Sequence, residues 1–397
     1  MNIKTLKDLE EIKGKTVLLR VDYNVPFDQN EEIADDTRIR YTLDTIKELQ
    51  GKSAKIVIIS HLGRPKGEIV EKLRLNKVAA RLKELTGAPV KKIDSSIGTE
   101  VKRKIEKLEE KEILVLENIR FHKEEKEGDP TFSETLASYG DIFVLDAFGA
   151  CHRDHCSISG IAKHLPSYAG LLLEKEIKAL APLIESDPKR PLTMIFGGAK
   201  IDTKIGVIKN FLNKADYFLM GGALSNTFLA AAGYNVAESL YEEDKVETAR
   251  EIMMECEKNK EHFVIPHDVV VASEISNEAK SLDIPVEDVI GDMKILDVGK
   301  WTAEKFNNII GDSGTVIWNG PLGLTEFTPF QNGTKLVAEA LAESNAVSII
   351  GGGDTIEAIK SLGIDETKFS HISTGGGACI EFLSGKSLPG IEAVTAK

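Results

Sequence analysis

The chain has 397 residues, 42% of them hydrophobic and 28% charged, which is typical of a soluble globular protein and argues against a disordered chain, a fibre or a small disulfide scaffold. Its 50 basic and 63 acidic residues give a net charge of −13, which disfavours general binding to nucleic acid or to an anionic membrane. The length predicts two domains, each large enough for its own core.

Short apolar runs rich in β-branched residues alternate with longer charged segments of helical period. The runs predict strands at residues 16–21, 56–59, 113–116, 142–145, 192–196, 217–220, 264–272, 315–318, 347–350 and 372–373. Helical patterns lie at residues 76–85, 170–180 and 334–343. Near-continuous apolar strands that alternate with helices are typical of parallel sheets covered on both faces. The expected fold class is therefore α/β, with two doubly wound, Rossmann-like parallel-sheet domains joined by a helix and a cleft between them.

The strand pattern pauses at residues 166–191, where one helical pattern is followed by Pro182, Pro188 and Pro191. We expect this segment to connect the two domains. The predicted boundaries are an N-terminal domain at residues 1–168, a connecting helix at 169–186, a C-terminal domain at 187–383 and a tail at 384–397.

Four cysteines lie at the irregularly spaced positions 151, 156, 256 and 379, which favours a reducing compartment. Residues 1–11 are polar and carry no apolar signal region, so we expect a cytoplasmic protein. The charge-free window at residues 217–237 approaches membrane-spanning length, but its glycines and asparagines predict a strand, a loop and a helix instead.

Basic residues gather at the strand ends of the first half of the chain. They are Arg20, Arg38, His61, Arg64, Arg120, His122, His152, Arg153 and His155. In open α/β sheets ligands bind beyond the carboxyl ends of the strands, so a parallel sheet would bring these groups together. Taken singly, each arginine is better explained by a surface ion pair. The whole set favours a site for a small polyanion, such as a phosphate plus a carboxylate, which guanidinium groups bind through paired hydrogen bonds.

The segment at residues 151–156 holds four possible zinc ligands within six residues. Structural zinc usually uses two well-separated ligand pairs, and Arg153 would place a cation beside the metal. The better interpretation is that the histidines and the arginine bind an anion and that the cysteines take no part.

The strand ends of the second half are rich in glycine. The turns lie at residues 197–200, 221–223, 319–323, 351–355 and 374–377. One glycine turn only permits a tight bend, but five in one domain favour a surface where backbone N–H groups and helix N-termini approach a nucleotide. Asp354 is a candidate Mg²⁺ ligand, with an N-cap as a compatible alternative. Lys200 and Lys204, four residues apart on one helical face, would neutralise phosphate, or else form a solvated lysine pair.

Two other classes of protein remain as alternatives. A nicotinamide-linked dehydrogenase is disfavoured because no G-x-G-x-x-G motif lies at a strand end, which also disfavours a protein kinase, and no P-loop is present. A two-domain solute-binding protein also closes over an anion, but it would normally carry an export signal.

Nine segments match one family in order along essentially the full chain. They lie at residues 20–26, 60–65, 116–122, 146–149, 197–200, 318–323, 351–355, 371–378 and 388–390. In these segments the sequence resembles the phosphoglycerate kinase family. The resemblance implies reversible phosphoryl transfer between 1,3-bisphosphoglycerate and ADP, giving 3-phosphoglycerate and ATP, in glycolysis. It also implies Mg²⁺ bound with the nucleotide, small-molecule partners with no nucleic acid and no membrane, and a cytoplasmic monomer.

The resemblance assigns the phosphoglycerate site to the N-terminal domain, at Asp22, Asn24, Arg38, His61, Arg64, Arg120, His152 and Arg153. It assigns the nucleotide site to the C-terminal domain, at Gly198, Lys200, Lys204, Gly221, Gly222, Asn319, Glu326, Gly352, Gly353, Asp354 and Thr355. The implied catalytic residues are Arg38, Lys200, Gly353 and Gly376, with Asp354 as the Mg²⁺ ligand. The tail would return to the N-terminal domain.

The implied reaction needs no general base, because the attacking carboxylate or phosphate oxygen is already ionised at pH 7. We expect catalysis from charge neutralisation by Arg38, Lys200, Mg²⁺ and backbone N–H groups, once the domains have closed over both substrates. The sequence departs from the family's usual pattern at Leu145, Cys151, Asp154, Thr203, Ala223 and Lys300. Three of these, Thr203, Ala223 and Lys300, bear on nucleotide affinity, and Asp154 is expected to weaken the anion site.

Overall fold

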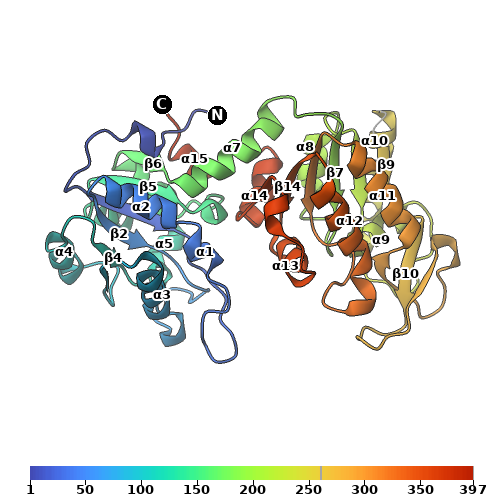
Figure 1. Ribbon diagram of the computed structural model, residues 1–397, viewed down its shortest axis with the longest axis horizontal. Coiled ribbons are helices and arrows are strands. Elements are labelled where there is room, and N and C mark those ends of the chain that lie inside the picture. Colours follow the sequence, from blue (N-terminus) through green and yellow to red (C-terminus); the bar gives the residue numbers. More distant parts are fainter. Residues whose placement is uncertain (260–261, 397) are drawn as a thin grey trace. The chain divides into compact units, whose positions relative to one another are not determined.

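The computed structural model of the protein describes residues 1–259 and 262–396 and divides into two compact units (Figure 1). The first unit comprises Met1–Ala181 and Ser387–Lys397, and the second comprises Pro182–Lys386. The division falls inside helix α7, Leu171–Glu185, at Pro182. The first unit is therefore built from two stretches of chain that are far apart in sequence.

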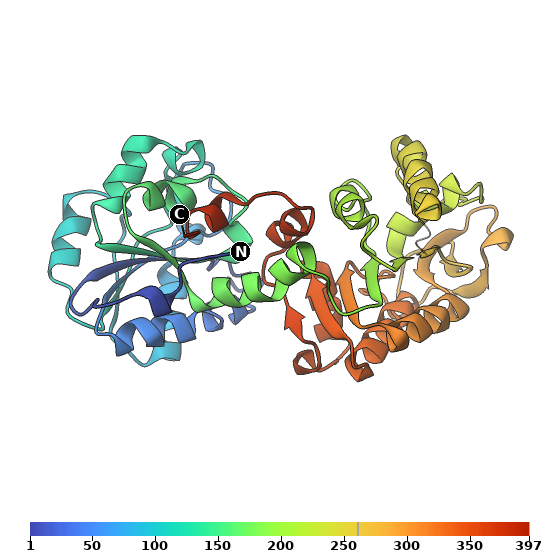
Figure 2. The same ribbon diagram turned by 90° about the horizontal axis from the view of Figure 1, so that it is seen from above.

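Six parallel strands form the sheet of the first unit, in the order β3-β4-β2-β1-β5-β6. Their bounds are Thr16–Val21 (β1), Lys55–Ile59 (β2), Val90–Lys92 (β3), Ile113–Val115 (β4), Ile142–Asp146 (β5) and Ser167–Ala169 (β6). In the centre Leu19 lies beside Ile58 and Val144. The four central strands, β4, β2, β1 and β5, are buried along nearly their whole length because helices cover both faces of the sheet (Figure 2), whereas the edge strand β3 is partly exposed.

The helices of the first unit supply the rest of its core. They are α1 (Thr37–Arg40), α2 (Leu43–Gly51), α3 (Asn76–Thr86), α4 (Thr99–Glu106), α5 (Glu124–Glu127), α6 (Pro130–Ala137) and α15 (Pro389–Glu392). Ile46 of α2 and Leu82 of α3 pack with Leu19 of β1 in one hydrophobic cluster. The two ends of the chain meet in this unit, where Ile3 and Thr395 form an antiparallel bridge and the Lys4 N–H donates to the Val394 carbonyl at 2.8 Å.

Six parallel strands also form the main sheet of the second unit, in the order β15-β14-β13-β7-β8-β9. Their bounds are Leu192–Phe196 (β7), Tyr217–Met220 (β8), His262–Val264 (β9), Thr315–Asn319 (β13), Val347–Gly351 (β14) and His371–Ile372 (β15). Strands β7, β8 and β9 extend to one side and β13, β14 and β15 to the other. The order therefore reverses between β7 and β13, where open α/β sheets bind ligands.

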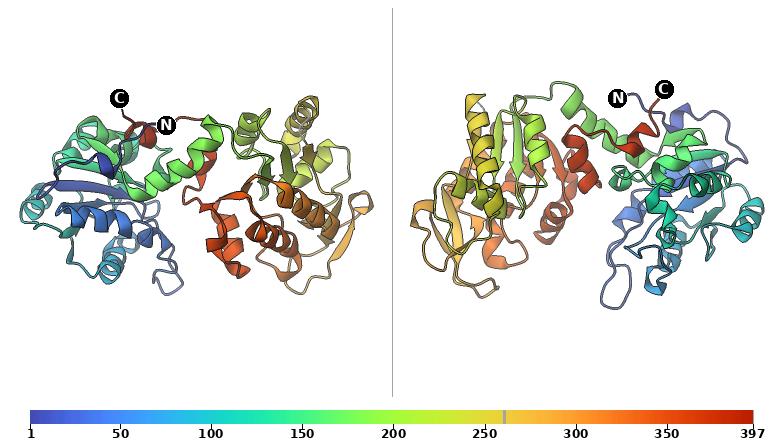
Figure 3. Two further views of the ribbon diagram at one scale, coloured as in Figure 1. Left: turned by 45° about the horizontal axis from the view of Figure 1, so that its top comes forward. Right: turned by 180° about the vertical axis from the view of Figure 1, so that it is seen from behind.

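Helices cover both faces of this sheet (Figure 3). They are α8 (Ile205–Phe211), α9 (Gly222–Ala231), α10 (Val246–Lys258), α11 (Lys300–Asp312), α12 (Asn332–Glu343), α13 (Gly353–Ser361) and α14 (Gly377–Leu383). Phe306 of α11 and Leu341 of α12 pack on the fully buried Trp318 of β13. Two α/β units with parallel main sheets confirm the predicted fold class.

One predicted strand is wrong. The run at 264–272 forms two strands, β9 and β10 (Asp268–Ala272), which belong to different sheets. Pro266 lies between them, and proline cannot donate a hydrogen bond within a sheet. Strand β10 pairs antiparallel with β11 (Leu282–Pro285) and β12 (Lys294–Val298), forming a three-stranded sheet that the all-parallel prediction missed. The other predicted strands match the observed ones to within one residue at each end.

The charge-free window at 217–237 folds as strand β8 followed by helix α9. Within residues 1–259 and 262–396, no helix combines the length and the apolar character that crossing a membrane requires. The connecting helix is longer than its predicted pattern at 170–180, because α7 continues through Pro182 to Glu185.

Candidate active site

Side chains from four neighbouring strands gather at the carboxyl edge of the first unit's sheet. Asp22 and Asn24 follow β1, His61 and Arg64 follow β2, Arg120 follows β4, and His152 and Arg153 follow β5. Because β4, β2, β1 and β5 are adjacent and parallel, their carboxyl ends share one edge. Arg38 reaches the same edge from helix α1.

Asp22 is a centre of this edge. Its Oδ2 lies 2.5 Å from Arg38 Nη1, and its Oδ1 lies 3.7 Å from His61 Nδ1. Burial opposes ionisation of Asp22, but His61, Arg38 and Arg20 together lower the pKa of its carboxyl to about 2. Asp22 is therefore ionised, and it holds Arg38 at the strand ends.

Hydrogen bonds tie the remaining residues into the same edge. The Asn24 side-chain oxygen accepts from the Gly63 N–H at 2.7 Å, and Arg120 Nη1 donates to the Gly63 carbonyl at 2.7 Å. Arg153 Nε donates to His152 Nε2 at 3.2 Å. The loop after β2 therefore joins the ends of β1 and β4 into one surface.

A buried network supports this surface from below. Arg20, only 1% exposed, donates through Nε to the Ser157 hydroxyl at 2.8 Å and lies with Nη2 3.1 Å from His61 Nδ1. The Ser157 hydroxyl in turn donates to Glu125 Oε1 at 2.6 Å. Burial lowers the pKa of His61 well below its usual value, so this ring is neutral. Because its Nδ1 accepts from Arg20, the proton of the ring lies on Nε2.

The edge carries more positive charge than its carboxylates balance. Burial, together with repulsion from Arg153 and Arg20, lowers the pKa of Arg120 to about 10. Burial lowers the pKa of Arg153 as well, and Arg64 and Arg38 repel it further. Cations that destabilise one another in this way are stabilised by a bound anion. The arrangement suits a small polyanion.

In the second unit, two glycine loops pack main chain against main chain at the β7/β13 reversal. The Gly198 N–H donates to the Pro321 carbonyl at 2.8 Å, and the Gly222 N–H donates to the Leu322 carbonyl at 2.8 Å. A Cβ atom on Gly222, whose φ is +61°, would lie 2.6 Å from the Gly198 nitrogen. Loop packing therefore already requires glycine at position 222. By contrast, a Cβ on Gly353, Gly376 or Gly377 would meet nothing within 4 Å.

Lys204 and Asn319 form the polar centre of the reversal. The Lys204 amine, almost fully buried, donates to the Asn319 side-chain oxygen. Burial lowers the pKa of Lys204 to about 8, although the nearby Asp354 opposes that shift. Asn319 Nδ2 is buried and has no hydrogen-bond partner among the residues that the structure describes. An unpaired buried donor beside a lysine favours an acceptor from a ligand, such as a phosphate oxygen.

Two local predictions are wrong. Lys200 and Lys204 do not share a helical face, because α8 begins only at Ile205 and Lys200 lies exposed in the turn before it. Asp354 is not the N-cap of α13, because Gly352, with φ +96°, takes that position. Asp354 is instead an exposed carboxylate in the first turn. Thr355 is buried, and its hydroxyl accepts from the Gly320 N–H at 2.7 Å.

A family model for phosphoglycerate kinase matches residues 6–386. A curated phosphoglycerate kinase from Dictyoglomus turgidum is 50% identical over 401 residues, covering 99% of each chain. The chain belongs to the phosphoglycerate kinase family. Solved structures of phosphoglycerate kinases agree with this fold. The one from Coxiella burnetii has a TM-score of 0.88 at 35% identity, and the one from Pyrococcus horikoshii has 0.86 at 33%, each covering 99% of this chain and 98% of its own.

The phosphoglycerate kinase family defines the reaction. The protein is a kinase, and phosphoryl transfer between 1,3-bisphosphoglycerate and ADP, giving 3-phosphoglycerate and ATP, follows from the family. The family implies a nucleotide substrate and usually Mg²⁺. Among the described residues, no group of three or more histidine, cysteine, aspartate or glutamate side chains is arranged to hold a metal ion. A single exposed carboxylate such as Asp354 fits Mg²⁺, which takes one or two carboxylates plus phosphate oxygens.

The departures from the phosphoglycerate kinase pattern have local explanations in two cases. Lys300 replaces the usual proline at the start of α11, and its N–H donates to Asp283 Oδ2 at 3.0 Å, a bond that proline cannot make. Asp154 is exposed and accepts a hydrogen bond from the Ser159 hydroxyl, which occupies one of its oxygens. Nothing in the structure explains Thr203 or Ala223.

Sequence reasoning missed Glu125 and Ser157. Glu125 lies in a charged run of the type that normally faces solvent, yet it is fully buried against Ser157. Arg20 offered the one usable signal, since a charged residue inside an apolar strand needs a buried partner.

Proposed function

We propose that the first unit binds the phosphoglycerate substrate and the second binds the nucleotide. The observation that carries this assignment is the surplus of positive charge at the first unit's sheet edge, where Arg153 and Arg20 destabilise the charged form of Arg120, and Arg64 and Arg38 destabilise that of Arg153. A three-carbon acid phosphate carries two anionic groups, and separated guanidinium groups match both.

The phosphoglycerate site takes Asp22, Asn24, Arg38, His61, Arg64, Arg120, His152 and Arg153. Arginines supply charge and paired donors, and the neutral His61 donates from Nε2. Asp22 does not neutralise the substrate. Its carboxylate accepts a hydrogen bond from a substrate hydroxyl. Arg38 then leaves its ion pair with Asp22 and turns toward the transferring phosphoryl group.

The nucleotide site takes Gly198, Lys200, Lys204, Gly221, Gly222, Asn319, Glu326, Gly352, Gly353, Asp354 and Thr355. Lys204 and the unpaired Asn319 amide support phosphate binding at the β7/β13 reversal. Glu326 is exposed after β13 and holds the ribose by resemblance to the family. Asp354 is the ligand for Mg²⁺, which, when bound with the nucleotide, neutralises phosphate charge.

Arg38, Lys200, Gly353 and Gly376 carry the chemistry in this proposal. The attacking oxygen is already ionised, so no side chain has to remove a proton. The arginine and lysine neutralise the phosphoryl group during transfer, and the two glycines, which have open space beside their Cα atoms, offer backbone N–H groups to it. The protein acts as a cytoplasmic monomer on small molecules, with no nucleic acid or membrane partner. The four cysteines are buried and outside any disulfide among the described residues, which supports a reducing compartment, and the charge of −13 disfavours nucleic acid and anionic membranes.

An acyl-phosphate trapping assay tests the site assignment. The protein is mixed with ATP, Mg²⁺, 3-phosphoglycerate and hydroxylamine, and hydroxamate is measured. We expect hydroxamate from the native protein and a rise in the KM for 3-phosphoglycerate, with an unchanged KM for ATP, in Arg120→Ala. Arg103→Ala on the exposed side of α4 is the matched control. A higher KM for ATP alone in Arg120→Ala would contradict the assignment of the two units.

A further inference from the structure

Helix α1 is a single turn, Thr37–Arg40, that carries Arg38. A helix this short is not stable alone, so its neighbours must set its position. On its inner side Ile39 is fully buried. Just beyond the turn, the Thr42 and Tyr23 hydroxyls share a 2.7 Å hydrogen bond. These contacts fix the distance of α1 from the core. They do not fix its rotation about its own axis, which must be set by contacts on its outer side.

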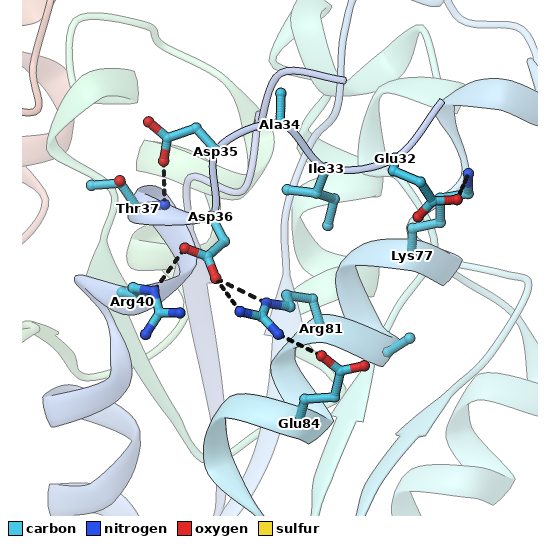
Figure 4. Close-up of a pocket in the computed structure, with 11 residues that line it drawn as sticks. Glu32, Ile33, Ala34, Asp35, Asp36, Thr37, Arg40, Lys77, Arg81 and Glu84 are labelled. Atoms are coloured by element: carbon cyan, nitrogen blue, oxygen red, sulfur yellow. Dashed lines mark hydrogen bonds and ion pairs between the residues drawn. The ribbon is translucent and has the colours of Figure 1, made fainter. Parts of the chain in front are cut away.

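The outer side of α1 borders a cavity of about 720 Å³ that also reaches helix α3 (Figure 4). Asp36 joins the two helices there. Its Oδ1 accepts from Arg40 Nε at 2.7 Å, and its Oδ2 accepts from Arg81 Nε at 2.8 Å. Arg81 Nη2 lies 2.8 Å from the same Oδ2, so the guanidinium grips one oxygen with two donors. The Asp36 side chain is only 18% exposed.

Helix α3 holds Arg81 in place for its ion pair with Asp36. Its Val78 and Leu82 are fully buried in the core of the first unit. The third guanidinium nitrogen of Arg81 is occupied as well, since Nη1 donates to Glu84 at 2.5 Å. Asp35 closes the start of α1 by accepting from the Thr37 N–H at 2.7 Å. The turn is therefore held to α3 by the Asp36 carboxylate.

Positions 36 and 40 lie on one face of a helical turn, and position 38 lies about 200° away from position 36 around the axis. When Asp36 and Arg40 face α3, Arg38 must face the opposite way. It does so, with Nη1 2.5 Å from Asp22 at the end of β1. We propose that the ion pair between Asp36 and Arg81 fixes the rotation of α1 and thereby directs Arg38 at the transferring phosphoryl group. Asp36 and Arg81 are then positioning residues, and the proposal rests on the role of Arg38 given above.

Steady-state kinetics of Arg81→Met test the proposal. We expect kcat to fall about tenfold, because misplacing a catalytic group by about 1 Å can cost as much as 10²-fold. The KM for ATP and the thermal midpoint are expected to stay unchanged. Arg81→Lys, which keeps the charge and one donor, should recover part of the rate. Lys83→Met removes the same charge from an exposed position of the same helix and should leave kcat unchanged.

The decisive comparison places Arg81→Met in the Arg38→Ala background. If the ion pair acts through Arg38, the second substitution lowers kcat no further there. An equal loss of kcat in both backgrounds, or a native kcat in Arg81→Met alone, would overturn the proposal while leaving the role of Arg38 intact. A native kcat in Arg38→Ala would instead refute the role of Arg38 first, and the positioning proposal with it.

Discussion

The two units differ in which atoms they expose at the carboxyl edges of their sheets. The first presents charged side chains such as Arg120 and Arg153, whereas the second presents main chain from loops such as those at Gly198 and Gly222. Side-chain cations attract an anion over a distance, but they repel one another until it binds. A main-chain surface carries no net charge and depends on loops that fit closely. Two anion sites in one chain can therefore fail for different reasons.

The largest effect expected is on the side-chain site. Arg38→Ala removes the cation that we place at the transferring phosphoryl group, so we expect kcat to fall roughly 10²–10³-fold with little change in the KM for ATP. Arg103→Ala, on the exposed side of α4, is the control. A native kcat in Arg38→Ala would remove this arginine from the reaction.

The second effect concerns the one carboxylate assigned to the metal. Asp354→Ala is expected to weaken apparent Mg²⁺-ATP affinity by about 10–100-fold. The thermal midpoint should not move, because the side chain is exposed. Glu357→Ala, exposed on the same helix, is the control, and titration with Mg²⁺ at fixed ATP is the measurement. An unaltered Mg²⁺ dependence would exclude Asp354 as the ligand.

The third effect is a pH dependence at the centre of the main-chain site. Before the nucleotide binds, burial lowers the pKa of the Lys204 amine to about 8. Below pH 8 the amine is charged before and after ADP binds, so affinity stays flat. Above pH 8 binding must take up a proton, so affinity should fall about tenfold per pH unit until the pKa in the complex is reached.

Lys204→Arg stays charged through this range and should flatten the profile of ADP affinity, which calorimetry between pH 7 and 9 would record. The last ionisation of a nucleotide phosphate has a pKa near 6 and is about 99% complete at pH 8, so it does not produce a fall in affinity above pH 8. Parallel profiles in both proteins would show that Lys204 is not the titrating group.

The smallest effect separates glycines needed for packing from glycines that face a ligand. Gly222→Ala should lower the free energy of unfolding by about 1–3 kcal/mol, because its Cβ would meet Gly198 and its φ is +61°. A Cβ on Gly353 meets nothing, so Gly353→Ala should leave unfolding unchanged and weaken nucleotide binding a few-fold. Equal free energies of unfolding in the two variants would show that the packing at Gly222 does not require glycine.

The strands could be predicted from the sequence because buried parallel strands are apolar along their whole length, as in residues 16–21 and 192–196. The gathering of Asp22, His61 and Arg120 followed from the rule that parallel strand ends share an edge. Strand β11 was missed for the converse reason, since it is short and mostly exposed and has no apolar pattern.

Contacts between distant residues were beyond sequence reasoning. Asp36 and Arg81 are 45 residues apart, and each looks like an ordinary surface charge. Glu125 lies among solvent-facing charges in sequence but is buried beneath Arg20 in the structure. The four-residue spacing of Lys200 and Lys204 led to the wrong prediction of a shared helical face, because α8 starts one residue after Lys204. In each case the missing information was where the chain turns.

The contacts between the N-terminal and C-terminal segments have a consequence for biosynthesis. Ile3 pairs with Thr395, and the Gly390 N–H donates to the Cys151 carbonyl at 2.9 Å, so the first unit is completed only after the second unit has been synthesised. At about 5–20 residues per second, the roughly 200 residues of the second unit delay that completion by roughly 10–40 s. During that interval the nascent first unit lacks its closing segment, and chaperones would meet it in that unfinished form.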